Sequence, residues 1–343
     1  MTGEIGTVPC PKCVVCDSNG LELYAGLRDR LFNAPGSWDL KMCPNRDCGL
    51  VWPDPMPLPT EIWKAYARYY THATDGPPKR SLLRQIYRQA KRNWLTASYG
   101  YPPVLPPSSP AHLRFAHYLV PTVRRTGFKD VRLLDFVAGG RLLDVGCGSG
   151  SWLVTMKELG WNIEGVDFDP EAVRVARELG LNVQVGSVEA QNYPSASFDA
   201  ITLSHVIEHV PDPVATVAEC ARLLKPGGKL VLFTPNAASF CHRYFKKNWR
   251  GLEPPRHLHI FTVASMHAML ARASFSQVAV RTHVGTSVTY ESRLLQKNWP
   301  HPVNLSVQGW RRKPLWHLFD ALQHSLVWVL PSVGECLTAI AVK

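Results

Sequence analysis

The stretch GRLLDVGCGSG, residues 140–150, decides the fold class of this chain. Residues 142–145 predict a buried strand, and glycines follow at Gly146, Gly148 and Gly150 before a helical pattern begins. Glycines at such a turn let the backbone approach a ligand closely, because no Cβ is in the way. Asp144 lies within the strand, and its carboxylate suits a ligand with a cationic amino-acid end better than a pyrophosphate. The stretch therefore predicts a nucleotide-type site at the end of a strand.

The residues around this stretch alternate between strand-like and helix-like patterns. Strands are expected at 140–146, 162–167, 182–186, 199–204, 228–234, 276–284 and 335–342, and helices at 151–159, 170–179, 212–225 and 262–273. This alternation predicts an α/β fold with a parallel sheet covered by helices on both faces. Asp167 closes the second of these strands, where a carboxylate can accept both hydrogen bonds of a ribose diol.

Composition narrows the class of protein and of partner. The 343 residues are 45% hydrophobic and carry a net charge of +11. A large folded core is expected, and the charge favours anionic partners such as phosphates. Because no apolar run of bilayer length and no signal-peptide pattern appear, we expect a cytoplasmic chain that does not span a membrane.

Three motifs together carry a family resemblance. The glycine stretch is followed by FDAITLSHVIEHVPDP at 198–213 and RLLKPGGKLVLFTPN at 222–236. In this order they resemble the class I S-adenosylmethionine-dependent methyltransferases, over about residues 111–281 and 335–343. The resemblance implies a Rossmann-like seven-stranded sheet, mostly parallel, with an antiparallel last strand. It also implies donor-binding residues: Asp144, Gly146, Cys147, Gly148 and Gly150 for the methionine end, Asp167 for the ribose, Phe168 for the adenine, and Ser187, Val188 and Ser204 nearby.

A histidine-rich pattern follows the fourth predicted strand. His205, Glu208 and His209 would share one face of a helical turn, and the later PRHLHIFT would direct His257 and His259 to one side of an extended segment. Three interpretations stay open. His209 or His257, beside Glu208, acts as a general base; His205, Glu208, His209 and His259 bind a second, divalent metal; or the histidines are structural. The motif VIEHVPDP resembles the ubiquinone-biosynthesis-type O-methyltransferases.

The cysteines cluster at the N-terminus. Nine are present, and Cys13-x₂-Cys16 and Cys43-x₄-Cys48 form two close pairs of the kind that bind one tetrahedral ion. Cys10 offers an alternative first pair with Cys13. The segment resembles the zinc-ribbon heads of some bacterial methyltransferases, and this resemblance implies a structural zinc bound by Cys13, Cys16, Cys43 and Cys48.

The chain divides into three predicted parts. A zinc-ribbon-like module covers 1–60, a basic helical connector covers 61–110, and a methyltransferase domain covers 111–343 with an insertion at 285–333. The connector repeats Arg80, Arg84, Arg88 and Lys91 on one face, which is either solvated or docks on lipid or RNA. The apolar stripe of the insertion suits a lid, a dimer contact or the surface of the inner membrane.

These features predict transfer of a methyl group from S-adenosylmethionine to a hydroxyl of a small molecule or sugar. The net charge of +11 favours an anionic acceptor, nucleotide-linked or lipid-linked. An RNA-acting methyltransferase is a weaker alternative, because no aromatic RNA-binding pattern accompanies the basic residues. N- or C-methylation of a natural product stays open, since the motifs specify the donor and leave the acceptor undefined.

Overall fold

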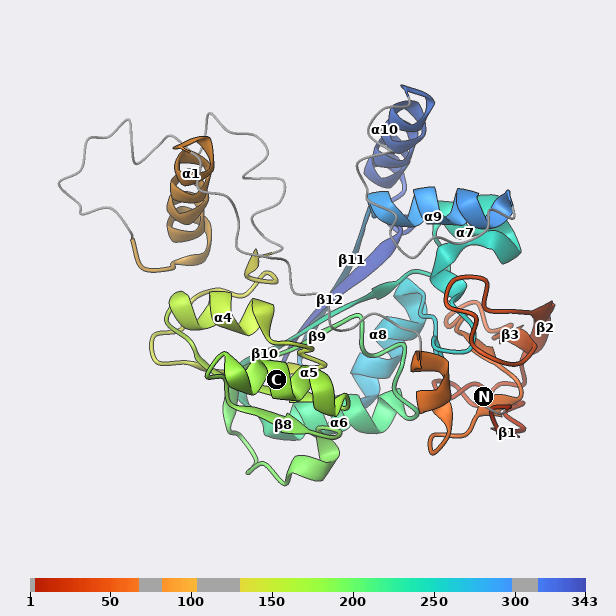
Figure 1. The fold of residues 1–343 in the computed structure, drawn as a ribbon, viewed down its shortest axis with the longest axis horizontal. Coiled ribbons are helices and arrows are strands. Elements are labelled where there is room, and N and C mark those ends of the chain that lie inside the picture. The colour runs from red at the N-terminus through yellow and green to blue at the C-terminus, as the bar shows by residue number, and fades with distance from the viewer. Residues whose placement is uncertain (1–3, 68–81, 104–129, 298–313) are drawn as a thin grey trace. The chain divides into compact units, whose positions relative to one another are not determined.

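The computed structural model describes residues 4–67, 82–103, 130–297 and 314–343 (Figure 1). The strands are β1 Thr7–Val8, β2 Leu21–Leu27, β3 Trp38–Met42, β4 Val51–Pro53, β5 Met56–Pro57, β6 Arg141–Val145, β7 Asn162–Asp167, β8 Val183–Val185, β9 Phe198–Ser204, β10 Leu224–Pro235, β11 Gln277–His283 and β12 Cys336–Val342. The α-helices are α1 Leu82–Tyr99, α4 Ser151–Glu158, α5 Pro170–Glu178, α6 Pro213–Leu223, α7 Phe240–Phe245, α8 Val263–Arg272, α9 Thr286–Gln296 and α10 Pro314–Val329. Short 3₁₀ helices lie at Ile62–Tyr66, Glu189–Gln191, Lys246–Asn248 and Arg250–Leu252.

The central sheet has seven strands in the order β11-β12-β10-β9-β6-β7-β8. β6 pairs in parallel with β7 and β9, and β7 pairs in parallel with β8. β12 runs antiparallel to β11. The predicted fold class, a mostly parallel methyltransferase sheet with an antiparallel last strand, is confirmed. Every strand and helix expected in the α/β part is present, with ends that differ by a few residues at most.

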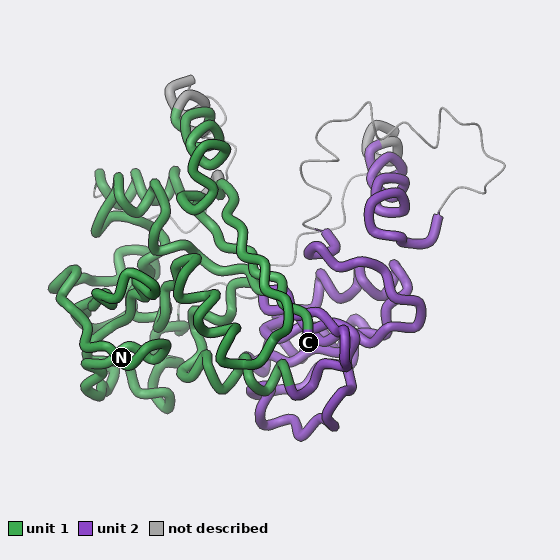
Figure 2. The backbone as a smooth tube through the Cα atoms, turned by 180° about the vertical axis from the view of Figure 1, so that it is seen from behind, with its two compact units in different colours: residues 1–69, 204–221, 232–342 green, residues 70–203, 222–231, 343 purple. Residues whose placement is uncertain are grey.

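The chain forms two compact units (Figure 2). Unit 1 comprises residues 1–69, 204–221 and 232–342, and unit 2 comprises 70–203, 222–231 and 343. Each unit therefore draws on segments that lie far apart in the sequence.

The N-terminal segment is built into unit 1. Its three-stranded sheet, β2-β3-β4, is joined to the later chain by a bridge between Val51 and Ile260. Leu27 and Leu40 are buried in one cluster with Phe245 and Trp249, which come more than 200 residues later. The N-terminal segment thus shares its core with residues of the methyltransferase part. The proposed boundaries at residues 60 and 110 stay predictions.

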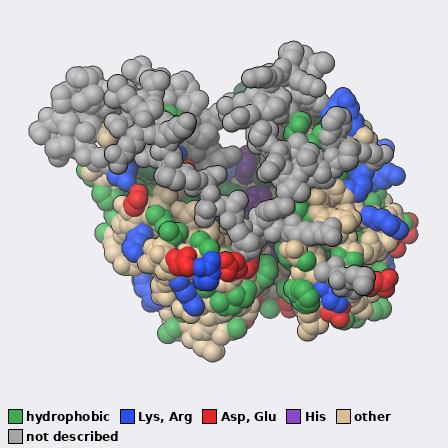
Figure 3. All heavy atoms as spheres, in the orientation of Figure 1, with side chains coloured by type: hydrophobic (Ala, Val, Ile, Leu, Met, Phe, Trp, Pro, Cys, Tyr) green, Lys and Arg blue, Asp and Glu red, His purple; other side chains and the backbone are tan. Residues whose placement is uncertain are grey.

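The two amphipathic segments are described in part. On α1, Lys91 pairs with Asp130, while Arg80 lies outside the described residues and the side chains of Arg84 and Arg88 are likewise not described. On α10, Trp328 is 87% exposed. Acidic and basic side chains intermingle on the face drawn in Figure 3. No helix among the described residues combines the length and the apolar character needed to cross a bilayer.

Candidate active site

The glycine loop and the end of β7 meet in unit 2. The amides of Gly146 and Cys147 donate to the carbonyl of Val166, at 2.7 and 3.2 Å. The amide of Gly148 donates to Asp167 Oδ2 at 2.7 Å, and the amide of Asp169 donates to Asp167 Oδ1 at 2.9 Å. These bonds hold the Asp167 carboxylate beside the loop, as the predicted donor site requires.

Gly150 shows why the loop needs glycine. It ends the loop at φ +78° and precedes α4, and a Cβ there would lie 2.3 Å from Leu181 Cδ1. Any side chain would be strained by the backbone and would clash with the core. The loop conformation therefore requires glycine at position 150.

Asp144 is buried below the loop. Its Oδ1 pairs with Arg132 and accepts a hydrogen bond from Thr202 Oγ1 at 2.7 Å, while Oδ2 has no hydrogen-bond partner in the described structure. Burial raises the pKa of Asp144, although Arg132 acts in the opposite direction. The Arg132 guanidinium also lies 3.7 Å from the centre of the Trp152 ring. The orphaned oxygen is a buried acceptor that suits the ammonium group of a methionine-type ligand.

The remaining predicted donor residues are spread around this edge of the sheet. Phe168 is 56% exposed just after β7, as a residue that packs on an adenine should be. Ser187 is exposed and Val188 is buried after β8. Burial raises the pKa of Cys147, so its thiol stays protonated and fills space. Ser204 ends β9 and belongs to unit 1. The assignment of these residues to the donor site stays a prediction.

The histidine cluster lies in unit 1. Glu208, His209 and His257 each offer a ligand atom, and these atoms lie within 4.8 Å of one another. Residues 205–209 form a turn closed by a hydrogen bond from His209 N to Val206 O, instead of the expected helical turn. His205, at φ +56°, breaks the helical path because helical residues need negative φ. Its ring Nδ1 still donates to Glu208 Oε1 at 3.3 Å.

The rings of His257 and His259 face different partners. His257 Nδ1 donates to the carbonyl of Gly251 at 2.7 Å, whereas His259 Nε2 faces the carbonyl of Pro211 at 3.2 Å. Burial lowers the pKa of both imidazoles to about 4. The predicted metal set of His205, Glu208, His209 and His259 is thus only partly brought together, and His257 takes the place of His205 and His259 in the cluster.

The tautomers in the cluster follow from their carbonyl partners. A carbonyl oxygen only accepts, so Nδ1 of His257 carries its proton toward Gly251, and Nδ1 of His209 carries its proton toward the carbonyl of Arg256 at 2.9 Å. Each Nε2 then keeps a lone pair. Burial opposes ionisation of Glu208, but the hydrogen bond from His205 and the other histidines lower its pKa to about 2. Two imidazoles and a carboxylate therefore converge, and together they can accept a proton or bind a cation.

The N-terminal segment reaches this cluster. The Tyr66 hydroxyl lies 3.0 Å from His209 Nδ1. Arg256, fully buried, donates to Asp29 Oδ2 at 2.8 Å and to Glu253 Oε1 at 2.9 Å. Glu253 Oε2 in turn lies 3.5 Å from His257 Nε2. A buried chain of charged groups thus links the loop after β2 to the histidines.

A pocket of about 260 Å³ opens beside the histidines, within unit 1. Its wall combines His205, His209 and His257 with four glutamates and Arg250. One of these glutamates, Glu335, is 2% exposed, and burial raises its pKa to about 7. An arrangement of this kind can bind and deprotonate a small polar molecule.

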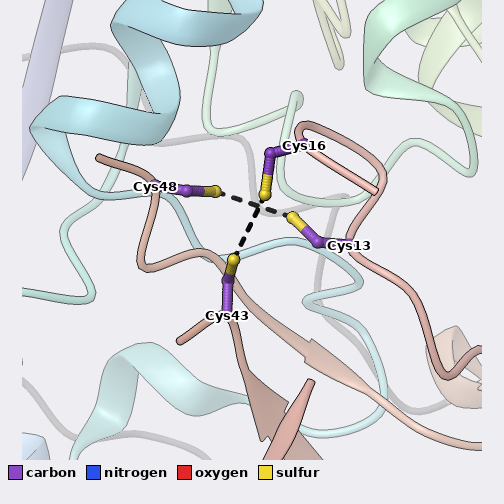
Figure 4. Close-up of side chains that lie close together, drawn as sticks. All are labelled: Cys13, Cys16, Cys43 and Cys48. Carbon is purple, nitrogen blue, oxygen red and sulfur yellow. Dashed lines mark hydrogen bonds between the residues drawn. The ribbon is translucent and has the colours of Figure 1, made fainter. Parts of the chain in front are cut away.

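The four predicted zinc ligands form one group (Figure 4). Cys13 and Cys48 are 3.6 Å apart at sulfur, and Cys16 and Cys43 are 3.3 Å apart. A tetrahedral zinc with bonds of about 2.3 Å places sulfurs about 3.8 Å apart, so the donor set and spacing fit zinc. Cys10 lies outside the group, and its sulfur faces the carbonyl of Lys12.

Several site residues were missed by sequence reasoning. Arg132 and Thr202 contact Asp144, and Tyr66, Glu253 and Glu335 surround the histidines. Only Thr202 carried a usable signal, since it lies on the strand next to Asp144 and pairs with it in register. Tyr66 and Glu335 reach the histidines over long sequence separations, whereas Arg132 and Glu253 lie close in sequence to their partners but belong to no recognised motif.

Comparisons with known proteins agree with this geometry. A family described as Methyltransferase domain matches residues 115–280. The ubiquinone biosynthesis O-methyltransferase of Xanthomonas oryzae pv. oryzae is 49% identical over 116 residues, which cover 30% of this chain and 48% of that protein. The chain thus spans about half the length of the first curated relatives that it matches. The protein of the same name from Thiobacillus denitrificans is 36% identical over 163 residues, which cover 45% of this chain and 70% of that protein.

Solved structures give a further comparison. A SAM-dependent methyltransferase from Archaeoglobus fulgidus superposes with a TM-score of 0.44 at 19% identity, covering 66% of this chain and 94% of that one. The family assignment depends instead on the sequence relatives, on the sheet order and on the glycine loop beside Asp167. The chain therefore belongs to the class I S-adenosylmethionine-dependent methyltransferases.

Proposed function

We propose that the chain transfers the methyl group of S-adenosylmethionine to a hydroxyl oxygen of a small molecule or sugar. The observation that carries the proposal is the convergence of Glu208, His209 and His257 on one pocket. The O-methyltransferases named above, similar over part of their length, point to the same class of reaction. Unit 2 supplies the donor-binding groups through the glycine loop, Asp144 and Asp167.

His209 is the proposed general base. With its proton on Nδ1, its Nε2 lone pair is free to take the proton of the acceptor hydroxyl. Transfer then forms an oxygen–carbon bond as the carbon–sulfur bond breaks, and S-adenosylhomocysteine leaves. Alignment of oxygen, carbon and sulfur contributes much of the rate in such a displacement. Glu208, ionised beside the ring, stabilises the imidazolium that forms.

A divalent metal at Glu208, His209 and His257 is a second candidate. Two imidazoles and a carboxylate form a donor set that zinc accepts, and Glu208 Oε2 is buried without a hydrogen-bond partner among the described residues. A bound metal would supply Lewis acidity and so lower the pKa of a hydroxyl that it ligates. The cysteine group at the N-terminus is proposed to bind a separate, structural zinc.

Isotope-labelled donor, incubated with the protein and a cell extract, tests this function. We expect a labelled product whose methyl group is located on oxygen by mass spectrometry and NMR, and loss of that product with His209→Ala. Metal analysis and treatment with a chelator separate the two candidates, because a base needs no metal. A label found on nitrogen or carbon, or full turnover by His209→Ala, would contradict the proposal.

A further inference from the structure

We infer that the 260 Å³ pocket of unit 1 takes an acceptor ring that carries hydroxyl groups but no phosphate or carboxylate, and that Glu335 selects it. This inference rests on the proposed function, because it identifies the pocket as the place where the acceptor enters. It departs from the expectation of an anionic acceptor that the net charge favours.

The charges on the wall disfavour an anion. Four glutamates line the pocket, namely Glu208, Glu253, Glu291 and Glu335. Arg250 also lines it, but its guanidinium already pairs with Glu253 and with Glu291, the latter at 2.6 Å. A phosphate in this pocket would face carboxylates without an uncommitted arginine among the described lining residues.

The hydrogen-bonding groups of the wall are mainly acceptors, apart from the proton that Glu335 holds below about pH 7. Glu335 Oε1 accepts from Trp249 Nε1 at 2.5 Å, while Glu335 Oε2 and Glu208 Oε2 are buried with no partner among the described residues. The imidazoles of His209 and His257 present lone pairs, because their Nδ1 protons are used by carbonyls. Hydroxyl groups donate hydrogen bonds to such a wall, whereas phosphate and carboxylate oxygens only accept. A buried acceptor left unpaired is costly, so the wall favours a ligand rich in hydroxyls.

The volume limits the ligand to one ring. About 260 Å³ lies below the range of about 300–1,000 Å³ that is common for ligand pockets. Pro235, Val288 and Cys336 add an apolar part to the wall, beside its carboxylates and imidazoles. A single ring that carries hydroxyls and has an apolar face therefore suits this wall, and the rest of a larger acceptor would stay outside.

Binding of matched probes tests the inference without requiring turnover. The full chain, saturated with S-adenosylhomocysteine, is titrated with D-glucose, its amino derivative D-glucosamine and its uronic acid D-glucuronate. The corresponding three compounds derived from galactose and from mannose are titrated in the same way. The resonances of labelled Glu335 and His257 report occupation of the pocket. We expect at least one neutral ring to bind, its amino derivative to bind as tightly or more tightly, and its uronic acid to bind at least about tenfold more weakly.

Substitutions of Glu335 test whether this residue determines the affinity for the ring. Glu335→Gln should keep the affinity for the neutral ring within about threefold, because it preserves the size and polarity of the group, and Glu335→Leu should lose at least about tenfold. Glu178→Gln, at an exposed position of α5, serves as the matched control. If Glu335→Leu fails to fold, the comparison of probes on the wild-type chain still tests the preference of the pocket for rings without a carboxylate.

Three results would overturn the inference: a uronic acid that binds as tightly as its neutral ring, no response to any neutral or amino ring up to about 50 mM, or wild-type affinity in Glu335→Leu. Failure of the proposed function looks different. A label on nitrogen or carbon, with the expected order of probes, removes the oxygen chemistry and leaves the preference of the pocket intact.

Discussion

The two units of the chain differ in how their functional residues are distributed along the sequence. In unit 2, the predicted donor residues lie between Asp144 and Val188 and follow the ends of neighbouring parallel strands. In unit 1, the pocket combines residues from the turn after β9, the 3₁₀ helix at Arg250–Leu252, α9 and the start of β12. Tyr66 contributes from the opposite end of the chain. The predicted donor site is thus formed by a local sequence motif, whereas the pocket proposed for the acceptor is assembled from distant segments.

The largest expected effect concerns the cysteine group. Cys16→Ser should abolish stoichiometric zinc binding and lower the free energy of unfolding by several kcal/mol, because structural zinc contributes about 10 kcal/mol or more to small domains. The N-terminal segment shares a core with Phe245 and Trp249, so the damage should reach the histidine pocket. Cys10→Ser is the matched control, since Cys10 lies outside the group. Metal analysis and calorimetric unfolding measure both; equal zinc content and stability in the two variants would remove the zinc site.

The next effect separates chemistry from donor binding. His209→Ala should lower turnover by about 10²–10⁴-fold, as loss of a general base does. Affinity for S-adenosylmethionine should stay within about twofold, because all the predicted donor residues except Ser204 lie in unit 2. His267→Ala, exposed on α8, is the control. A large loss of donor affinity in His209→Ala would show that the two functions are not divided in this way.

A pH experiment sharpens the assignment of Glu335. Burial raises its pKa from 4.5 to about 7 in the folded chain, so between these values the folded state holds a proton that the unfolded state releases. Stability therefore falls as pH rises through this window, by about 1.4 kcal/mol per pH unit. Glu335→Gln lacks this loss, and the difference in unfolding free energy between variant and wild type should grow from pH 5 to pH 7. Histidines titrate equally in both proteins and cancel; a constant difference contradicts the raised pKa.

The smallest expected effect tests the reach of the N-terminal segment. Tyr66→Phe should lower turnover by about three- to tenfold, because the Tyr66 oxygen is a second acceptor for the proton on His209 Nδ1 and that contact is lost. Tyr66 is a positioning residue, so the pH profile of turnover should shift together with the rate. Tyr24→Phe is the matched control, since Tyr24 makes a similar bond of 3.1 Å to His242 away from the pocket. Identical profiles in all three proteins would give Tyr66 a structural role only.

The same contrast explains how much the sequence predicted. The strand pattern and the glycines of 140–150 are local features, so the sheet, the loop and the place of Asp167 were predicted correctly. The cysteine spacing correctly grouped four thiols for the same reason. The histidine cluster was predicted only in part, because the turn at His205 depends on a positive φ and on the carbonyl of Phe233, which accepts from the His205 amide at 2.8 Å. Glu335 escaped notice because nothing in its neighbouring sequence marks a buried carboxyl group.

Calorimetric titration of S-adenosylmethionine into the wild type, Asp167→Ala and His257→Ala tests the central division most directly. We expect binding to the wild type, a loss of about 100-fold or more in Asp167→Ala, and a change within about twofold in His257→Ala. Asp167 anchors the glycine loop through Gly148, which is the physical reason for the loss. No heat with the folded wild type, or unchanged binding by Asp167→Ala, would contradict the account.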